Sequence, residues 1–217
     1  MESAVATLAS DIVHSYAIID RTWNVFDNIT RADVDLCIWR RPYLSEVSNR
    51  LAAVTGPQIE LRRTTTPASF SADISTLVSA AGLDPGAHSL WLEDMHVLAD
   101  RFFIVADGRE VLLRLELTDD DGCRRYHVDR SYLRLLCTYR GPGTEWLENA
   151  QVDREALRSR APNEDILRSG EPQHLTSFEV GLFKGSLYPN TRAGGLVHRS
   201  PPATEADILR VKMCLDC

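Results

Sequence analysis

A short segment in the second half of the chain, Tyr126-His127-Val128-Asp129, carries an imidazole and a carboxylate at alternate positions. Alternate residues of a β-strand point to the same face, so both side chains would project together. His198 follows later, at the end of another apolar segment. Two histidines and one carboxylate form the facial triad of non-haem Fe(II) oxygenases, which leaves coordination positions open for a cosubstrate and oxygen. We therefore predict that His127, Asp129 and His198 bind a metal and form the catalytic centre. The alternative is that they are ordinary polar residues at strand ends and turns.

An arginine placed after the second histidine extends this pattern. Arg210 follows His198 by 12 residues and shares a face with Lys212 in an alternating segment. Oxygenases that use 2-oxoglutarate need a cation for the distal carboxylate of this cosubstrate, and a guanidinium offers a planar, two-pronged donor. We therefore predict that Arg210 binds 2-oxoglutarate, with help from Tyr139 or Thr138. The alternative is that this arginine lies on the solvent face of an edge strand.

The segment Gly141-Pro142-Gly143-Thr144-Glu145-Trp146 has the composition of a turn that can approach a ligand. Its glycines adopt backbone angles closed to other residues, and the proline between them stiffens the turn. We predict that Trp146 stacks on a substrate and that Thr144 donates a hydrogen bond to it. Arg199, next to the second histidine, is predicted to orient an anionic substrate. The alternative is a tight hairpin in which Trp146 belongs to the core.

The elements that must position these residues change in character near residue 100. Helical spacing of apolar residues dominates before that point, and short apolar or alternating segments separated by turns dominate after it. The predicted helices are 3–19, 43–54, 71–81, 89–102 and 153–160, and the predicted strands are 34–39, 102–106, 111–118, 123–129, 132–139, 178–184, 195–198 and 208–215.

These elements indicate one α+β domain over residues 1–217. A mainly helical part, residues 1–100, is expected to pack on a jelly-roll barrel part, residues 101–217, of the double-stranded β-helix or cupin-like type. The metal would lie in the mouth of the barrel, where inward-facing residues line a cavity.

Three longer segments carry a resemblance to a known family. The first is residues 134–147. The second consists of residues 181–185 and 195–201, and the third is residues 37–41, which read Cys-Ile-Trp-Arg-Arg. They resemble the hallmark segments of the uncharacterised bacterial family DUF 1826, across most of the chain. The resemblance implies that His127, Asp129 and His198 belong to motif blocks of this family, which favours a metal site. The family has no established activity to carry over.

Composition argues against several classes of function. The chain has 217 residues, of which 44% are hydrophobic and 25% charged, as in soluble globular proteins. Its net charge of −7 argues against binding nucleic acid through general electrostatics. No segment approaches the length of a membrane span, and the N-terminus lacks the basic segment of a signal peptide. We therefore expect a cytoplasmic protein with reduced cysteines, and the close pair Cys214 and Cys217 is only a weak metal signal.

The leading hypothesis is an Fe(II)- and 2-oxoglutarate-dependent oxygenase that hydroxylates a small molecule or a peptide, with no nucleic-acid or membrane partner. The same three ligands suit zinc. The first alternative is therefore a cupin-like zinc or iron protein of metal homeostasis that does not use 2-oxoglutarate. The second alternative is a non-enzymatic interaction module that binds through the glycine-rich turn. Binding of 2-oxoglutarate would separate the first two, and loss of a bound metal in His127→Ala would exclude the third.

Overall fold

The computed structural model describes residues 16–56, 58–118, 123–189, 191, 193–202 and 209–217. Within these residues the backbone forms a seven-stranded and a three-stranded sheet. The larger sheet contains, in spatial order, β1 (Tyr16–Asp20), β2 (Val34–Trp39), β8 (Val180–Lys184), β5 (Leu133–Arg140), β10 (Arg210–Asp216), β4 (Val111–Thr118) and β3 (Ile59–Thr65). The smaller sheet contains β7 (Gln173–His174), β6 (Glu145–Leu147) and β9 (Val197–Arg199). Neighbouring strands are antiparallel except for β1 and β2, which are parallel.

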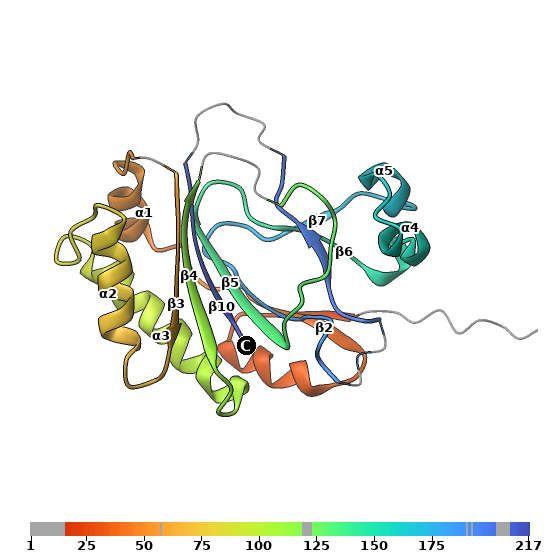
Figure 1. The fold of residues 1–217 in the computed structure, drawn as a ribbon, viewed down its shortest axis with the longest axis horizontal. Helices are drawn as coiled ribbons and strands as arrows, with labels where there is room; N and C mark the ends of the chain where they lie inside the picture. Colours follow the sequence, from red (N-terminus) through yellow and green to blue (C-terminus); the bar gives the residue numbers. More distant parts are fainter. Residues whose placement is uncertain (1–15, 57, 119–122, 190, 192, 203–208) are drawn as a thin grey trace, which may run out of the picture.

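Helices cover one face of the larger sheet, and the smaller sheet lies across its other face (Figure 1). The helices that pack on the larger sheet are α1 (Ser45–Ala52), α2 (Phe70–Ala80) and α3 (Ser89–Ala106). The remaining helical segments are the 3-10 helices η1 (Trp23–Thr30) and η2 (Asn149–Gln151) and the short helices α4 (Arg154–Arg158) and α5 (Asn163–Ile166). Within the described residues, no helix has both the length and the apolarity needed to cross a membrane.

The alternating sequence of β4 shows how the sheet separates two environments. Its odd-numbered residues are buried in the core shared with the helices; they are Val111, Leu113, Leu115 and Leu117. Arg114 and Glu116 project from the opposite face, because successive side chains of a strand alternate between faces. The register pairs Arg114 with Cys214 and Glu116 with Lys212 of β10. Charged residues therefore gather on the face turned toward the smaller sheet.

A second apolar cluster fills the space between the two sheets. Its buried members are Leu36, Ile38, Leu136, Trp146, Leu175, Phe183, Leu196 and Cys214. Because this cluster joins strands of both sheets, it fixes the smaller sheet on the larger one. The chain is thus a mixed α+β protein with a large, mainly antiparallel sheet, as the sequence predicts at that level.

Most predicted elements are confirmed to within a few residues. Among the helices, 43–54, 71–81 and 153–160 correspond to α1, α2 and α4. Among the strands, 34–39, 111–118, 132–139, 178–184 and 195–198 correspond to β2, β4, β5, β8 and β9. The strand predicted at 208–215 corresponds to β10, although its first residue lies outside the described residues.

Several local features differ from prediction. Residues 16–20 of the predicted helix 3–19 form β1, and residues 3–15 lie outside the described part of the chain. The predicted strand 102–106 is wrong, because the buried positions of α3 keep helical spacing as far as Ala106. The predicted strand 123–129 contributes an isolated bridge between His127 and His198. The edge strand β3 was not predicted.

The Asp107-Gly108 pair, which signals a hairpin in the sequence, ends α3 instead. Both residues have positive φ, 49° and 73°. This left-handed backbone is the common way to terminate a helix, and it tolerates aspartate and glycine better than most residues. The pair therefore reverses the chain after a helix and not between two strands.

Candidate metal centre

The three predicted metal ligands converge in the structure. One donor atom from each of His127, Asp129 and His198 lies within 4.8 Å of the other two. The Nε2 atom of His127 is 3.5 Å from Asp129 Oδ1, and that of His198 is 3.2 Å from Asp129 Oδ2. Two backbone hydrogen bonds, each 3.0 Å long, connect His127 with His198 in both directions. This antiparallel pairing places the two rings side by side, with centroids 4.6 Å apart.

The other nitrogen of each ring is held by a backbone carbonyl. His127 Nδ1 is 2.8 Å from the carbonyl oxygen of Arg125, and His198 Nδ1 is 3.2 Å from that of Leu196. A carbonyl oxygen can only accept, so each Nδ1 carries a hydrogen and each Nε2 is the ring nitrogen that faces Asp129. Metal-binding histidines are commonly oriented in this way. Two imidazole nitrogens and one carboxylate oxygen fit a divalent iron or zinc ion.

The electrostatic surroundings favour the protonation states that a metal needs. Burial raises the pKa of the Asp129 carboxyl, but His198, His127 and Arg134 together hold it well below its usual range. Arg134 Nη1 lies 2.5 Å from Asp129 Oδ2. Burial lowers the pKa of His198, although the Asp129 carboxylate beside it opposes this shift. An ionised carboxylate and a neutral imidazole are the forms that coordinate metals, and the pKa shifts of Asp129 and His198 both act in that direction.

A cavity of about 300 Å³ lies beside this triad, and a ladder of ion pairs forms one wall. Lys212 Nζ is 2.7 Å from Glu116 Oε2. Arg114 Nη2 is 2.8 Å from Asp216 Oδ2, and Arg134 Nε is 2.5 Å from Asp216 Oδ1. These side chains come from three adjacent strands and are only slightly exposed. The wall can therefore present fixed charges to a ligand without extended, mobile side chains.

A buried carboxylate on the smaller sheet anchors the segments that carry both histidines. Tyr126 precedes His127, and its hydroxyl donates to Glu145 Oε1 at 2.7 Å. Arg199 follows His198 and donates to the same carboxylate through Nε, at 3.1 Å, and Nη2, at 2.9 Å. Its guanidinium also lies over the Tyr126 ring, 4.5 Å from the centroid. Glu145 is 2% exposed, so these charge-assisted bonds are little weakened by water.

The residues predicted to bind substrate divide into two groups. Thr144 and Arg199 line the cavity beside the triad. Trp146 is 6% exposed and belongs to the apolar cluster between the sheets. It pairs with His198 across β6 and β9. Trp146 is not among the described residues that line the cavity.

The residues predicted to bind 2-oxoglutarate do not line this cavity. Arg210 is buried at the start of β10, and its Nε donates to the carbonyl oxygen of Pro142 at 3.0 Å. Tyr139 lies on the helix-facing side of β5, where its hydroxyl donates to Asp94 Oδ2 at 2.7 Å. Thr138 is buried in the same strand. Among the described residues that line the cavity, none of these three is present.

Sequence reasoning missed most of the charged wall and the Glu145 anchor. Arg114, Glu116 and Arg134 lie in strands whose other residues are mostly apolar. A charged residue at such a position signals either a solvated face or a polar site. A polar site can be told from a solvated face when charged residues recur at such positions on several strands, because ion pairs across strands need facing partners.

The likeness to known proteins is clear at the level of the family. No curated protein matches the chain. Similar solved structures include AviO1 from Streptomyces viridochromogenes Tue57, with 15% identity over 93% of this chain and 96% of that chain and a TM-score of 0.46. AtDAO1, a dioxygenase for auxin oxidation from Arabidopsis thaliana in complex with 2-oxoglutarate, has 13% identity over 82% and 72% and a TM-score of 0.44. T7H from Neurospora crassa in complex with alpha-KG has 14% identity over 89% and 76% and a TM-score of 0.42. Residues 20–216 match the family DUF1826, whose description is 'protein of unknown function', and the chain belongs to this family.

Proposed function

We propose that the protein is a non-haem Fe(II)- and 2-oxoglutarate-dependent oxygenase in which His127, Asp129 and His198 hold the iron. The observation that carries this proposal is the convergence of two imidazole Nε2 atoms and a buried carboxylate beside a cavity. This donor set is the facial triad, and it leaves one side of the metal open. Iron bound there would supply the oxidation chemistry, with 2-oxoglutarate as cosubstrate. The two facing sheets would correspond to the two halves of a jelly roll.

The residues around the triad would fix the geometry of the ligands. Arg134 holds the Asp129 carboxylate from one side, and its own position is set by Asp216. The backbone carbonyls at Nδ1 fix the planes of both imidazoles. Such outer contacts keep ligands in place before the metal arrives, which reduces the cost of ordering them.

Lys212 is the cation we assign to the distal carboxylate of 2-oxoglutarate. It lines the cavity, whereas Arg210, on the same strand, does not. The Lys212 ammonium pairs with Glu116, but an ammonium has three N–H donors, so the ion pair leaves donors for a further carboxylate. Thr144 and Arg199 remain the proposed substrate contacts, because both line the same cavity.

Anaerobic titration of the iron-loaded protein with 2-oxoglutarate tests this function. The expected result is a visible charge-transfer band from the iron chelate of 2-oxoglutarate. Lys212→Met should weaken 2-oxoglutarate binding at least tenfold, the effect of losing one charge-assisted hydrogen bond. Arg210→Met is the matched comparison and should leave the affinity nearly unchanged.

Two outcomes would contradict the assignment. If iron binds at the triad and the band does not form, the oxygenase function is refuted. The function supported would then be that of a metal protein without 2-oxoglutarate chemistry. If the band forms but is lost in Arg210→Met and kept in Lys212→Met, the cosubstrate carboxylate belongs at Arg210.

A further inference from the structure

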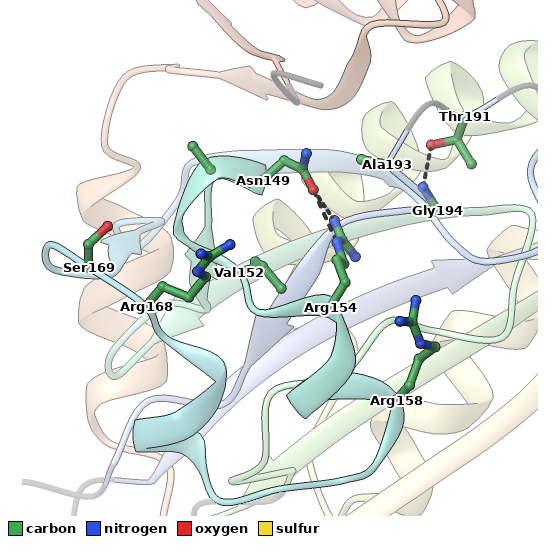
Figure 2. A pocket seen from close by; sticks show the side chains of 10 residues that line it. Asn149, Val152, Arg154, Arg158, Arg168, Ser169, Thr191, Ala193 and Gly194 are labelled. Atoms are coloured by element: carbon green, nitrogen blue, oxygen red, sulfur yellow. Dashed lines mark hydrogen bonds between the residues drawn. The ribbon is translucent and has the colours of Figure 1, made fainter. Parts of the chain in front are cut away.

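A second and larger cavity, of about 950 Å³, lies beside α4 and is lined by residues from the part of the chain between β6 and β9 (Figure 2). Its walls come from η2, from α4 and its surroundings, and from the residues that precede β9. It shares no described lining residue with the cavity beside the triad. A ligand bound here would therefore contact residues that the proposed oxygenase function does not use.

The charge of this cavity is opposite to that of the whole protein. Arg154, Arg158 and Arg168 line it, and the described lining residues include no carboxylate. The protein as a whole carries a net charge of −7. A local group of guanidinium groups in an acidic protein concentrates positive potential at one place, which attracts anions.

Arg154 is positioned without being neutralised. Its Nε and Nη2 donate to Asn149 Oδ1 at 3.0 and 2.6 Å, and an amide oxygen carries no net charge. Its Nη1 donates to no described residue. Burial lowers the pKa of this guanidinium, partly offset by the Asp35 carboxylate, which accepts a hydrogen bond from Thr191. A partly buried charge that lacks a paired carboxylate is costly to the fold, and a bound anion would remove that cost.

The other two arginines flank Arg154 (Figure 2). Arg158 pairs with Glu155 at 2.5 Å, but both side chains are mostly exposed, at 70% and 79%. Such a pair is weak and readily exchanged for another anion. Among the described residues no ion pair or hydrogen bond of the Arg168 side chain is found, and its electrostatic neighbour is the Asp153 carboxylate, which caps α4. All three guanidinium groups are therefore available to a ligand in this cavity.

We propose that this cavity binds a small phosphorylated molecule, with Arg154, Arg158 and Arg168 as donors to its phosphate group. A phosphate offers several acceptor oxygens and carries up to two negative charges, which matches three guanidinium forks better than a carboxylate does. No aromatic side chain is among the described lining residues. A sugar or alkyl phosphate therefore fits better than a nucleotide, whose base would need a stacking partner.

Isothermal titration calorimetry of the full, metal-free protein with glycerol 3-phosphate tests the proposal. Titrations at constant ionic strength should show saturable binding of one molecule per chain. Arg154→Gln and Arg168→Gln should each weaken binding at least tenfold. Arg21→Gln removes the same charge from an exposed arginine elsewhere and should leave the affinity unchanged. His127→Ala should also bind normally, since the site is separate from the triad.

The outcomes are decisive in either direction. Absence of saturable binding, or equal weakening by Arg21→Gln, overturns the site. Loss of binding in His127→Ala places the anion at the metal centre and overturns it too. Malonate binding as tightly as glycerol 3-phosphate would refute the phosphate assignment. Arg168→Gln keeps the test valid if Arg154→Gln misfolds, because the Arg168 side chain is exposed and makes no contact that the described fold requires.

Discussion

Removing the imidazole of His198 should remove most of the stabilisation of the fold by Fe(II). A ligand that binds only the native state at a hundredfold excess over its Kd stabilises that state by about 2.7 kcal/mol. For a chain of 217 residues, each kcal/mol corresponds to roughly 2–4 °C in Tm. Iron at that excess should therefore raise the Tm of the wild type by roughly 5–11 °C.

The variant His198→Ala loses one of three donors. Changes to groups that merely support a ligand already lower metal affinity by about 10- to 100-fold, so loss of the ligand itself should exceed that range. A Kd raised to the iron concentration leaves about 0.4 kcal/mol of stabilisation, or roughly 1–2 °C. The assay is anaerobic thermal denaturation followed by circular dichroism, with and without Fe(II).

The quantity compared is the iron-induced shift within each variant. His198 is buried and packs against Phe183, so truncation lowers the Tm of the metal-free protein as well. His174→Ala is the matched control, because this histidine is exposed on β7 and the substitution is the same. The reasoning is refuted if His198→Ala keeps the wild-type shift, or if the wild type shows none.

Three further substitutions test the surroundings of the site. Glu145→Gln should lower iron affinity about tenfold in a folded protein, because both histidine segments lose their shared anchor; equilibrium titration measures this. Gly143→Ala should lower stability by about 1–3 kcal/mol, because a Cβ there would lie 1.9 Å from the carbonyl oxygen of Leu175. Tyr139→Phe should cost about 1–3 kcal/mol, because it deletes a buried hydrogen bond to the Asp94 carboxylate. Urea denaturation measures both stabilities.

Each of these three predictions would be contradicted by a specific result. Unchanged iron affinity in Glu145→Gln would mean that the anchor does not set the ligand geometry. Wild-type stability in Gly143→Ala would mean that the chain near Leu175 moves freely out of the way. A Tyr139→Phe variant that loses 2-oxoglutarate binding, with its stability intact, would restore this tyrosine to the cosubstrate site.

Sequence reasoning succeeds here where the information is local. The alternation in Val111–Thr118 predicts the bounds of β4, because burial on one face imposes a period of two. The pairing of His127 with Asp129 was predicted from strand alternation, yet this segment forms only one bridge, at His127. The two side chains still converge, because Arg134 and His198 hold Asp129 from the other side.

Features that depend on distant partners were not predictable. Residues 16–20 look helical in isolation, but they pair in parallel with β2, a partner outside any local window. Whether Arg210 or Lys212 lines the cavity also depends on strand pairing that a local segment of sequence does not contain. Both lie on one face of β10, and a register shift against β5 falls between them, at Val211 and Lys212. Which cation meets the cavity is therefore decided by the pairing of strands.

The helical part of the chain supplies no ligand to the triad, yet β5 connects it to the site. On the helix-facing side of this strand, Tyr139 donates to Asp94 of α3, which also pairs with the buried Arg41. On the opposite side, Arg134 of the same strand holds the Asp129 carboxylate. Since a strand fixed at both faces has little freedom to slide or tilt, the helices constrain the direction from which Arg134 approaches the ligand. The N-terminal half would thus contribute to the proposed metal site through the rigidity of one strand.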